Sequence, residues 1–189
     1  MAGFALAGDT SGQLVVNAPA VAGSNTLTLQ AATATNSVNT LATAVATTSG
    51  TSIDFTGLPA WVKKITVMFS GVSTNGSSVV QLQIGAGSVT TSGYTGAVWV
   101  SSSNASMSTG FLTSSSAASG DTRYLIATLA TLGSNIWVYS FSGGYGNGAY
   151  TAYGGGGLTL GGTLDRVRIT TVNGTDVFDA GSVNLLLEG

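Results

Sequence analysis

The carboxylates are the realistic acid–base groups of this chain. Its 189 residues include no histidine and no cysteine, so neither a Ser-His-Asp nor a Cys-His arrangement can be built, and disulfides and thiolate zinc sites are excluded. A glycosidase would need two carboxylates held about 5–9.5 Å apart, and nothing in their spacing requires this. We therefore expect no enzyme and no catalytic, cofactor-binding or metal-binding residue. The carboxylates are Asp9, Asp54, Asp121, Asp165, Asp176, Asp179 and Glu188.

Two short stretches have a composition that could bind a ligand. The segment 173–181, "NGTDVFDAG", offers oxygen atoms to calcium, but it lacks the alternating acidic pattern and the closing glutamate of an EF-hand loop. We interpret it as a hairpin turn that leads into a strand and whose aspartates cap backbone N–H groups. The segment 142–157, "SGGYGNGAYTAYGGGG", is not followed by the helix that a phosphate-binding loop needs. It is either a plain structural loop or a display loop that offers Tyr145, Tyr150 and Tyr153 to a sugar or a protein.

Charge is scarce in this sequence. Only 6% of the residues are charged, and five basic against seven acidic residues give a net charge of -2. Such a chain has no field that would gather phosphates or anionic lipid headgroups. We therefore expect neither nucleic acid nor membrane among its partners, and no run approaches the length of about 18 apolar residues that a transmembrane helix requires.

The elements that must position these groups are predicted to be strands. Helical periodicity is nearly absent, and Val, Ile, Thr and aromatic residues alternate between turn signals, including Asn-Gly at 75–76, 147–148 and 173–174. The fold class we predict is all-β, an antiparallel jelly-roll-like β-sandwich over 51–189 with an extended N-terminal β arm over 1–50. Eight strands are expected at 52–55, 62–70, 79–84, 97–101, 124–129, 136–141, 164–171 and 182–187. Period two places in the core Ile65, Val67, Phe69, Leu82, Ile84, Ile136, Val138, Val167 and Ile169.

The only two lysines stand side by side at the entrance of the second expected strand. Adjacent residues of a strand point to opposite faces, and Lys commonly protects exposed strand edges. We therefore interpret Lys63 and Lys64 as marking an edge or rim of the sandwich and, with the preceding Trp61, as a candidate contact with a neighbour.

The arm, residues 1–50, contains too few large apolar side chains to form a core of its own. Ordering about 50 residues costs on the order of 50–100 kcal/mol in conformational entropy, so the arm should need a partner. Two short strand-like pieces are expected around Pro19. The candidate residues for trimerisation or particle attachment are Phe4, Leu6, Leu14, Val15, Val16, Val21, Leu27 and Leu29.

Three stretches carry a resemblance to a known family. They are "TSIDFTGLPAWVKKITVMFSGVSTNG", "LDRVRITTVNGTDVFDAGSVNLLLEG" and, in the arm, "GQLVVNAPAVAGSNTLTLQAATAT". Together they cover about half of the chain, which resembles structural proteins of the tailed-bacteriophage virion. The resemblance implies a trimeric knob joined to the particle by its arm, without catalytic residues.

The resemblance leaves the place on the virion open. Our leading expectation is a homotrimeric capsid decoration, or cement, protein on the outer surface of the head, with the major capsid protein or another virion protein as partner. The alternative is a receptor-binding module on a short tail fibre or baseplate that recognises a host glycan through the tyrosine segment. A glycan-processing enzyme is a third reading. Copy number per virion separates the first two.

Overall fold

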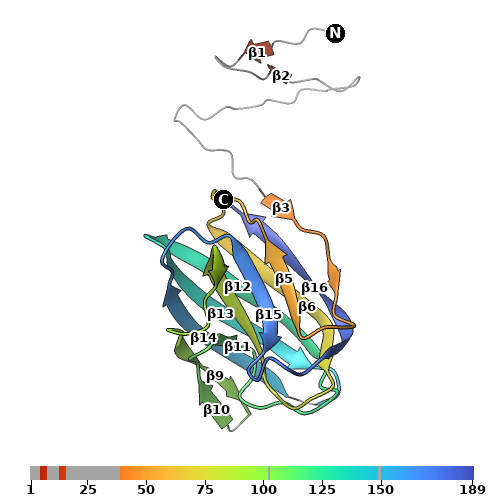
Figure 1. The fold of residues 1–189 in the computed structure, drawn as a ribbon. Helices are drawn as coiled ribbons and strands as arrows, with labels where there is room; N and C mark the ends of the chain where they lie inside the picture. Colours follow the sequence, from red (N-terminus) through yellow and green to blue (C-terminus); the bar gives the residue numbers. More distant parts are fainter. Residues whose placement is uncertain (1–4, 8–12, 16–38, 102, 149) are drawn as a thin grey trace, which may run out of the picture. The chain divides into compact units, whose positions relative to one another are not determined.

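The computed structural model describes residues 5–7, 13–15, 39–101, 103–148 and 150–189. The chain divides into two units, Met1–Asn36 and Ser37–Gly189. The second unit is an antiparallel β-sandwich of two sheets (Figure 1). Within the described parts of the chain there is no helix with the length and apolar character needed to cross a bilayer.

The larger sheet has nine strands in the order β10-β9-β14-β13-β12-β6-β16-β3, and β4 also pairs with β16. Neighbouring strands run antiparallel throughout. The strands are β3 (Asn39–Leu41), β4 (Val45–Ala46), β6 (Lys64–Thr74), β9 (Thr95–Val100), β10 (Ser103–Ser106), β12 (Arg123–Gly133), β13 (Ile136–Tyr145), β14 (Thr151–Thr159) and β16 (Phe178–Glu188).

The smaller sheet has five strands in the order β11-β7-β15-β5, and β8 also pairs with β7. Early strands pair with late ones in both sheets, β6 with β16 and β7 with β15, whereas β12, β13 and β14 follow one another. The antiparallel sandwich is therefore confirmed, while the particular strand order of a jelly roll is not. The strands are β5 (Ser52–Thr56), β7 (Val80–Ala86), β8 (Ser88–Val89), β11 (Phe111–Leu112) and β15 (Arg166–Thr171).

The core lies between the two sheets and is rich in aromatic rings. Phe111 of the smaller sheet stacks on Tyr139 of the larger one with centroids 4.5 Å apart, and Tyr94 meets Phe111 edge to face at 4.7 Å. The core prediction is confirmed for most positions, which are buried as expected: Ile65, Val67, Phe69, Leu82, Ile84, Val167 and Ile169.

The core prediction is wrong on β13. Ile136 and Val138 are 38% and 43% exposed, and the alternate residues Trp137, Tyr139 and Phe141 face inward instead. Because a strand has period two, choosing the wrong face inverts every side chain on it. Larger rings bury more apolar area than Ile or Val, so the sandwich gains more from the aromatic face.

The glycine-rich segment is also not the loop that the sequence suggested. Residues Thr151–Thr159 form β14, which pairs with β13 on one side and β9 on the other. Only the short turn between β13 and β14 remains of the expected display loop. The glycines belong to a strand that two neighbours hold by backbone hydrogen bonds.

The sandwich begins before the expected boundary at residue 51. Strand β3 pairs with the C-terminal end of β16. Thr47 is fully buried, and its N–H donates to the carbonyl of Gly181 at 2.9 Å. Ser37 therefore marks the start of the sandwich unit. In the preceding unit, β1 (Ala5–Ala7) and β2 (Gln13–Val15) form an antiparallel pair. Both lie before Pro19, and the second expected piece, at 26–30, lies outside the described residues.

Candidate functional surface

Two of the carboxylates bind arginines on or beside β15. Asp54 accepts two hydrogen bonds from Arg168, at 2.7 and 3.0 Å. Asp165 accepts two from its neighbour Arg166, at 2.7 and 3.1 Å, and these lower the pKa of the Asp165 carboxyl. Such bidentate pairs fix both side chains, so these carboxylates have structural partners.

The remaining described carboxylates also have partners. Asp121 accepts the Ala118 N–H at 2.8 Å, Asp179 accepts the Ser73 hydroxyl, and Glu188 pairs with Lys64 at 2.9 Å. Asp176 accepts the Ser78 N–H at 2.8 Å. Each one therefore contributes to the fold through an ion pair, a cap on a backbone N–H group or, for Asp179, a side-chain hydrogen bond.

The turn at 173–181 is held by capping hydrogen bonds, but it is not the hairpin turn that the sequence predicted, because it carries the chain from β15 of the smaller sheet to β16 of the larger one. Asn173 Oδ1 accepts the N–H groups of Thr175 and Asp176, at 3.0 and 3.2 Å. The Asn173 amide in turn donates to Asp176 at 2.6 Å. Among the described residues no group of three or more acidic side chains is placed to hold a metal ion.

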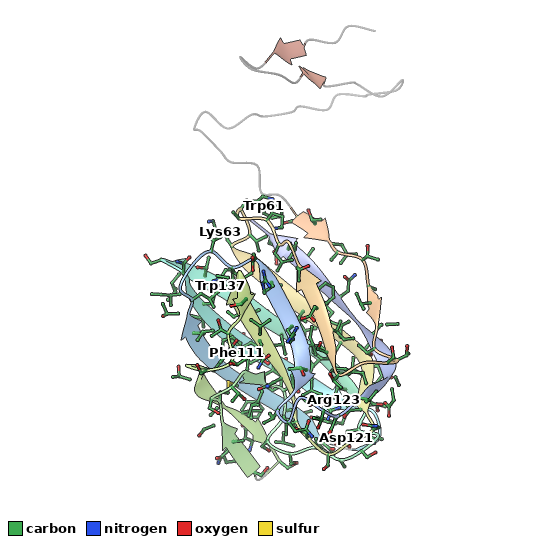
Figure 2. All side chains as sticks on the ribbon, in the orientation of Figure 1. Trp61, Lys63, Phe111, Asp121, Arg123 and Trp137 are labelled. Atoms are coloured by element: carbon green, nitrogen blue, oxygen red, sulfur yellow. The ribbon has the colours of Figure 1, made fainter. Side chains whose placement is uncertain are left out.

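The rim residues lie at one end of the sandwich, opposite Arg123 and Asp121 (Figure 2). The Lys64 ammonium is taken up by Glu188, and the Lys63 N–H donates to the Glu188 carbonyl at 2.8 Å while its side chain is exposed. Trp61 is half-buried and packs against the core. Trp61 thus covers the end of the sandwich, and Lys63 remains available to a neighbour.

The three tyrosines of the expected display loop are separated by the fold. Tyr145 is buried, and its ring centroid lies 4.6 Å from that of Tyr150 and 5.6 Å from the guanidinium carbon of the fully buried Arg123. Burial of Tyr145 raises the pKa of its phenol. Tyr150 donates to Asp121 at 3.3 Å. Tyr153 alone is an exposed large hydrophobic residue, and it lies on β14. The prediction of one display loop that offers all three tyrosines is therefore wrong.

The arm residues can be placed only in part. Leu6 stands opposite Leu14 in the β1–β2 register, and Val15 stands opposite Ala5. Phe4, Val16, Val21, Leu27 and Leu29 lie outside the described residues. The attachment role of the arm stays a prediction.

The feature that the sequence did not reveal is the outer face of the larger sheet. One row crosses seven strands, because directly opposite residues lie on the same face. The row contains Asn184, Met68, Ile126, Ser142, Tyr153, Trp99 and Asn104. Its neighbours on this face include Tyr124 and Val138, which are exposed.

Within this face we distinguish an apolar patch on β6, β12 and β13. The patch consists of Met68, Tyr124, Ile126 and Val138, of which Ile126 is 57% exposed. A shallow depression lies over its centre, between Met68, Tyr124 and Ile126. Apolar side chains that gather on one exposed face commonly mark an interaction site. The alternation along 124–129 was visible in the sequence, but both of its faces are apolar and only the fold shows which one is exposed.

We compared the chain with protein-family models, with curated proteins and with solved structures, and none of them matches it. Its function is therefore argued from its own sequence and geometry.

Proposed function

We propose that this chain is a non-enzymatic structural protein of the tailed-phage virion, a homotrimeric decoration protein that clamps and stabilises the head. The proposal joins the sequence resemblance to one structural observation, the apolar patch on the outer face of the larger sheet. Its partners are two further copies of the chain and the major capsid protein or another virion protein. It requires no cofactor.

The patch supports a subunit contact for a physical reason. Burying an exposed Ile, Val or Tyr side chain is favourable by about 25 cal/mol per Å² of apolar surface. No charged side chain projects from the outer face of β12 or β13, and the charge that β6 carries on this face, Lys64, is paired with Glu188. A trimer closes through three copies of a heterologous contact. The patch of one subunit would thus meet a different surface of the next.

The N-terminal unit supports attachment to the particle. It is separate from the sandwich, and fully burying a Leu or Val contributes only about 1.5–3 kcal/mol. Its few large apolar residues therefore need backbone pairing as well, which a strand donated to a neighbour's sheet edge provides. In this proposal the sandwich is the knob and the arm holds it to the head.

The alternative, a receptor-binding module on a short tail fibre or baseplate, is favoured by a different observation. Trp99 and Tyr153 stand opposite each other on β9 and β14 with exposed rings. Quantitative mass spectrometry of purified virions separates the two functions. Hundreds of copies per particle support the decoration role, and a few to a few dozen support the tail.

The trimer can be tested by placing a charge in the patch. Ile126→Asp leaves the core intact, because the side chain is exposed, but it would bury an unpaired carboxylate in the contact, which costs several kcal/mol. Native mass spectrometry should find trimers for the natural chain and monomers for this variant.

The matched control is Leu132→Asp, at the tip of the β12–β13 hairpin, 76% exposed and outside the patch. It should remain trimeric. A monomeric natural chain would refute the homotrimer. If Ile126→Asp stays trimeric, the patch is not the subunit contact.

A further inference from the structure

A second region of the same face lies over β14 and β9, and we call it the aromatic strip. It consists of Trp99, Tyr153, Gly155 and Gly157. Tyr153 is 55% exposed and Trp99 39% exposed, and they are paired across the two strands. The Trp99 indole N–H donates to the Ser101 carbonyl at 2.6 Å, which fixes one edge of the ring and leaves the strip a rigid aromatic surface.

The two glycines of the strip are less constrained than their inward-facing neighbours, and Gly157 leaves room for a Cβ at ordinary contact distance. A Cβ on Gly157 would come no closer than 3.4 Å to another atom, and one on Gly155 no closer than 3.2 Å, while neither residue has a positive φ. The inward-facing Gly154 and Gly156 differ, since a Cβ there would collide with β9. Glycine in a strand costs roughly 0.5–1 kcal/mol and often marks a place where a ligand approaches the backbone closely.

The surroundings of the strip are uncharged and only partly polar. Val138 of the apolar patch stands opposite Gly157, and Ala97 stands opposite Gly155, so the strip borders the patch. Strands β9, β10, β13 and β14 contain no charged residue. Ser142 flanks Tyr153 on one side and Asn104 flanks Trp99 on the other, both exposed. Hydrogen-bonding groups therefore border an apolar floor, and no cation is present to select an acidic ligand.

This combination fits a sugar ring better than a protein surface. A pyranose has apolar C–H faces, which pack on aromatic rings, and hydroxyls at its edge, which hydrogen-bond to amide and hydroxyl groups. The floor from Tyr153 to Gly157 spans four residues, about 13 Å along the strand, and it lacks side chains that would obstruct a chain of sugars.

We propose that the aromatic strip binds an uncharged polysaccharide, with Trp99 and Tyr153 as stacking surfaces and Gly155 and Gly157 as the open floor. The site does not depend on the decoration role, and it is the site that the alternative receptor-binding function would use. A head protein with this strip would hold the particle against neutral glycans of a cell surface.

Affinity electrophoresis tests the proposal with the full chain. The probes are dextran, yeast mannan, galactomannan and barley β-glucan as neutral polymers, and alginate as the acidic comparison. We expect at least one neutral polymer to retard the natural protein and alginate not to. Tyr153→Ala and Gly157→Val should each weaken the retardation about tenfold, which corresponds to losing one stacking contact or blocking one sugar position.

Gly161→Val is the matched control, since a Cβ there meets nothing within 4 Å and the residue lies outside the strip. It should bind like the natural chain, and thermal unfolding should show all three variants folded. The proposal would be overturned if no neutral polymer retarded the natural protein, or if only alginate did. It would also be overturned if both strip variants were retarded as strongly as the natural protein. A third contrary outcome is that the strip substitutions dissociate the oligomer and leave polysaccharide binding unchanged. The virion copy number and the Ile126→Asp test are read independently, so either proposal can fail alone.

Discussion

Tyr94 directly precedes β9 of the larger sheet, and its buried side chain ties that end of the strand to the smaller sheet. Its ring meets Phe111 in the core, while its hydroxyl donates to the Thr90 carbonyl at 2.9 Å and accepts the Ile84 N–H at 2.8 Å. Burial raises the pKa of this phenol to about 12. Burial also raises the pKa of Tyr139 well above its usual value. Neither ring can be ionised without disturbing the core.

Alkaline pH should therefore unfold the protein through these tyrosines. In the unfolded chain Tyr94 loses its proton near pH 10, but in the folded chain it keeps the proton to about pH 12. The folded state then binds more protons, so the contribution of Tyr94 to the free energy of unfolding is constant below about pH 10 and falls above it. By pH 12 the loss from Tyr94 alone is about 2 kcal/mol.

Urea unfolding at a series of pH values checks this prediction. Tyr94→Phe should flatten the decline above pH 10. The variant should itself be less stable at neutral pH by about 1–3 kcal/mol, because the Ile84 N–H loses an acceptor. A variant with an unchanged alkaline decline would show that Tyr94 does not control it.

At the scale of elements, β14 is the clearest case of a strand that tertiary contacts impose on an unfavourable sequence. Glycine has a low strand propensity, yet Gly154 to Gly157 lie between two hydrogen-bonded neighbours. The glycines alternate in role. Gly156 faces inward, where a Cβ would collide with the Thr95 carbonyl and lie 2.9 Å from Met107 Sδ, whereas Gly157 faces outward, where a Cβ would come no closer than 3.4 Å to another atom.

Replacing adjacent glycines by alanine should thus have opposite effects. Gly156→Ala should destabilise the protein by about 1–3 kcal/mol through overpacking. Gly157→Ala should be neutral or stabilising by about 0.4–1 kcal/mol, because it restricts the unfolded chain without strain. Equal losses for both variants in chemical unfolding experiments would contradict the alternation that we assign to β14.

The sequence predicted the strands with strong alternation and missed those defined by their neighbours. The strands at 62–70 and 164–171 were found because branched residues alternate there, but no local signal distinguishes β14 from a loop. Turn chemistry was only a partial guide. Of the Asn-Gly pairs, only 147–148 closes a hairpin, whereas 75–76 and 173–174 carry the chain from one sheet to the other. The β12–β13 hairpin turns instead at Ser134 and Asn135, with φ values of 50° and 60°.

The candidate surface was even less accessible from the sequence. Trp99, Ile126 and Tyr153 are far apart in the chain, and they share one row only because β6, β12, β13, β14 and β9 are adjacent in the larger sheet. The lysine pair, in contrast, was correctly placed at one end of the sandwich, since it precedes a strong strand, but it does not protect an edge strand, because β6 lies between β12 and β16. Local pattern thus predicted position along a strand but not which strands lie side by side.

At the scale of the whole molecule, the boundary between the arm and the sandwich decides which residues the sandwich needs for its stability. The segment before residue 51 belongs to the sandwich from Ser37 onward. Thr47 is fully buried, and its hydroxyl donates to the Ala180 carbonyl at 2.6 Å. The Gly50 carbonyl accepts the Phe178 N–H at 2.9 Å, and the Ala42 N–H donates to the Leu185 carbonyl at 2.8 Å. Residues 39–50 therefore protect the edge of β16.

Two shortened chains separate the sandwich from the arm. A chain that begins at Ser37 should match the full chain in free energy of unfolding, because it keeps β3, β4 and Thr47. A chain that begins at Ser49 should be about 2–4 kcal/mol less stable, since the buried hydrogen bonds of Thr47 and the pairing at the β16 edge are lost, each bond contributing about 1 kcal/mol. Both free energies can be measured by chemical unfolding.

In the proposed decoration role, the Ser37 chain should also fail to rebind phage heads stripped of this protein, because the arm supplies the attachment, while the full chain rebinds them. If the folded Ser37 chain decorates heads as well as the full chain does, the arm is not the attachment, and the contact must lie on the sandwich, with the rim at Trp61, Lys63 and Lys64 as the next surface to test.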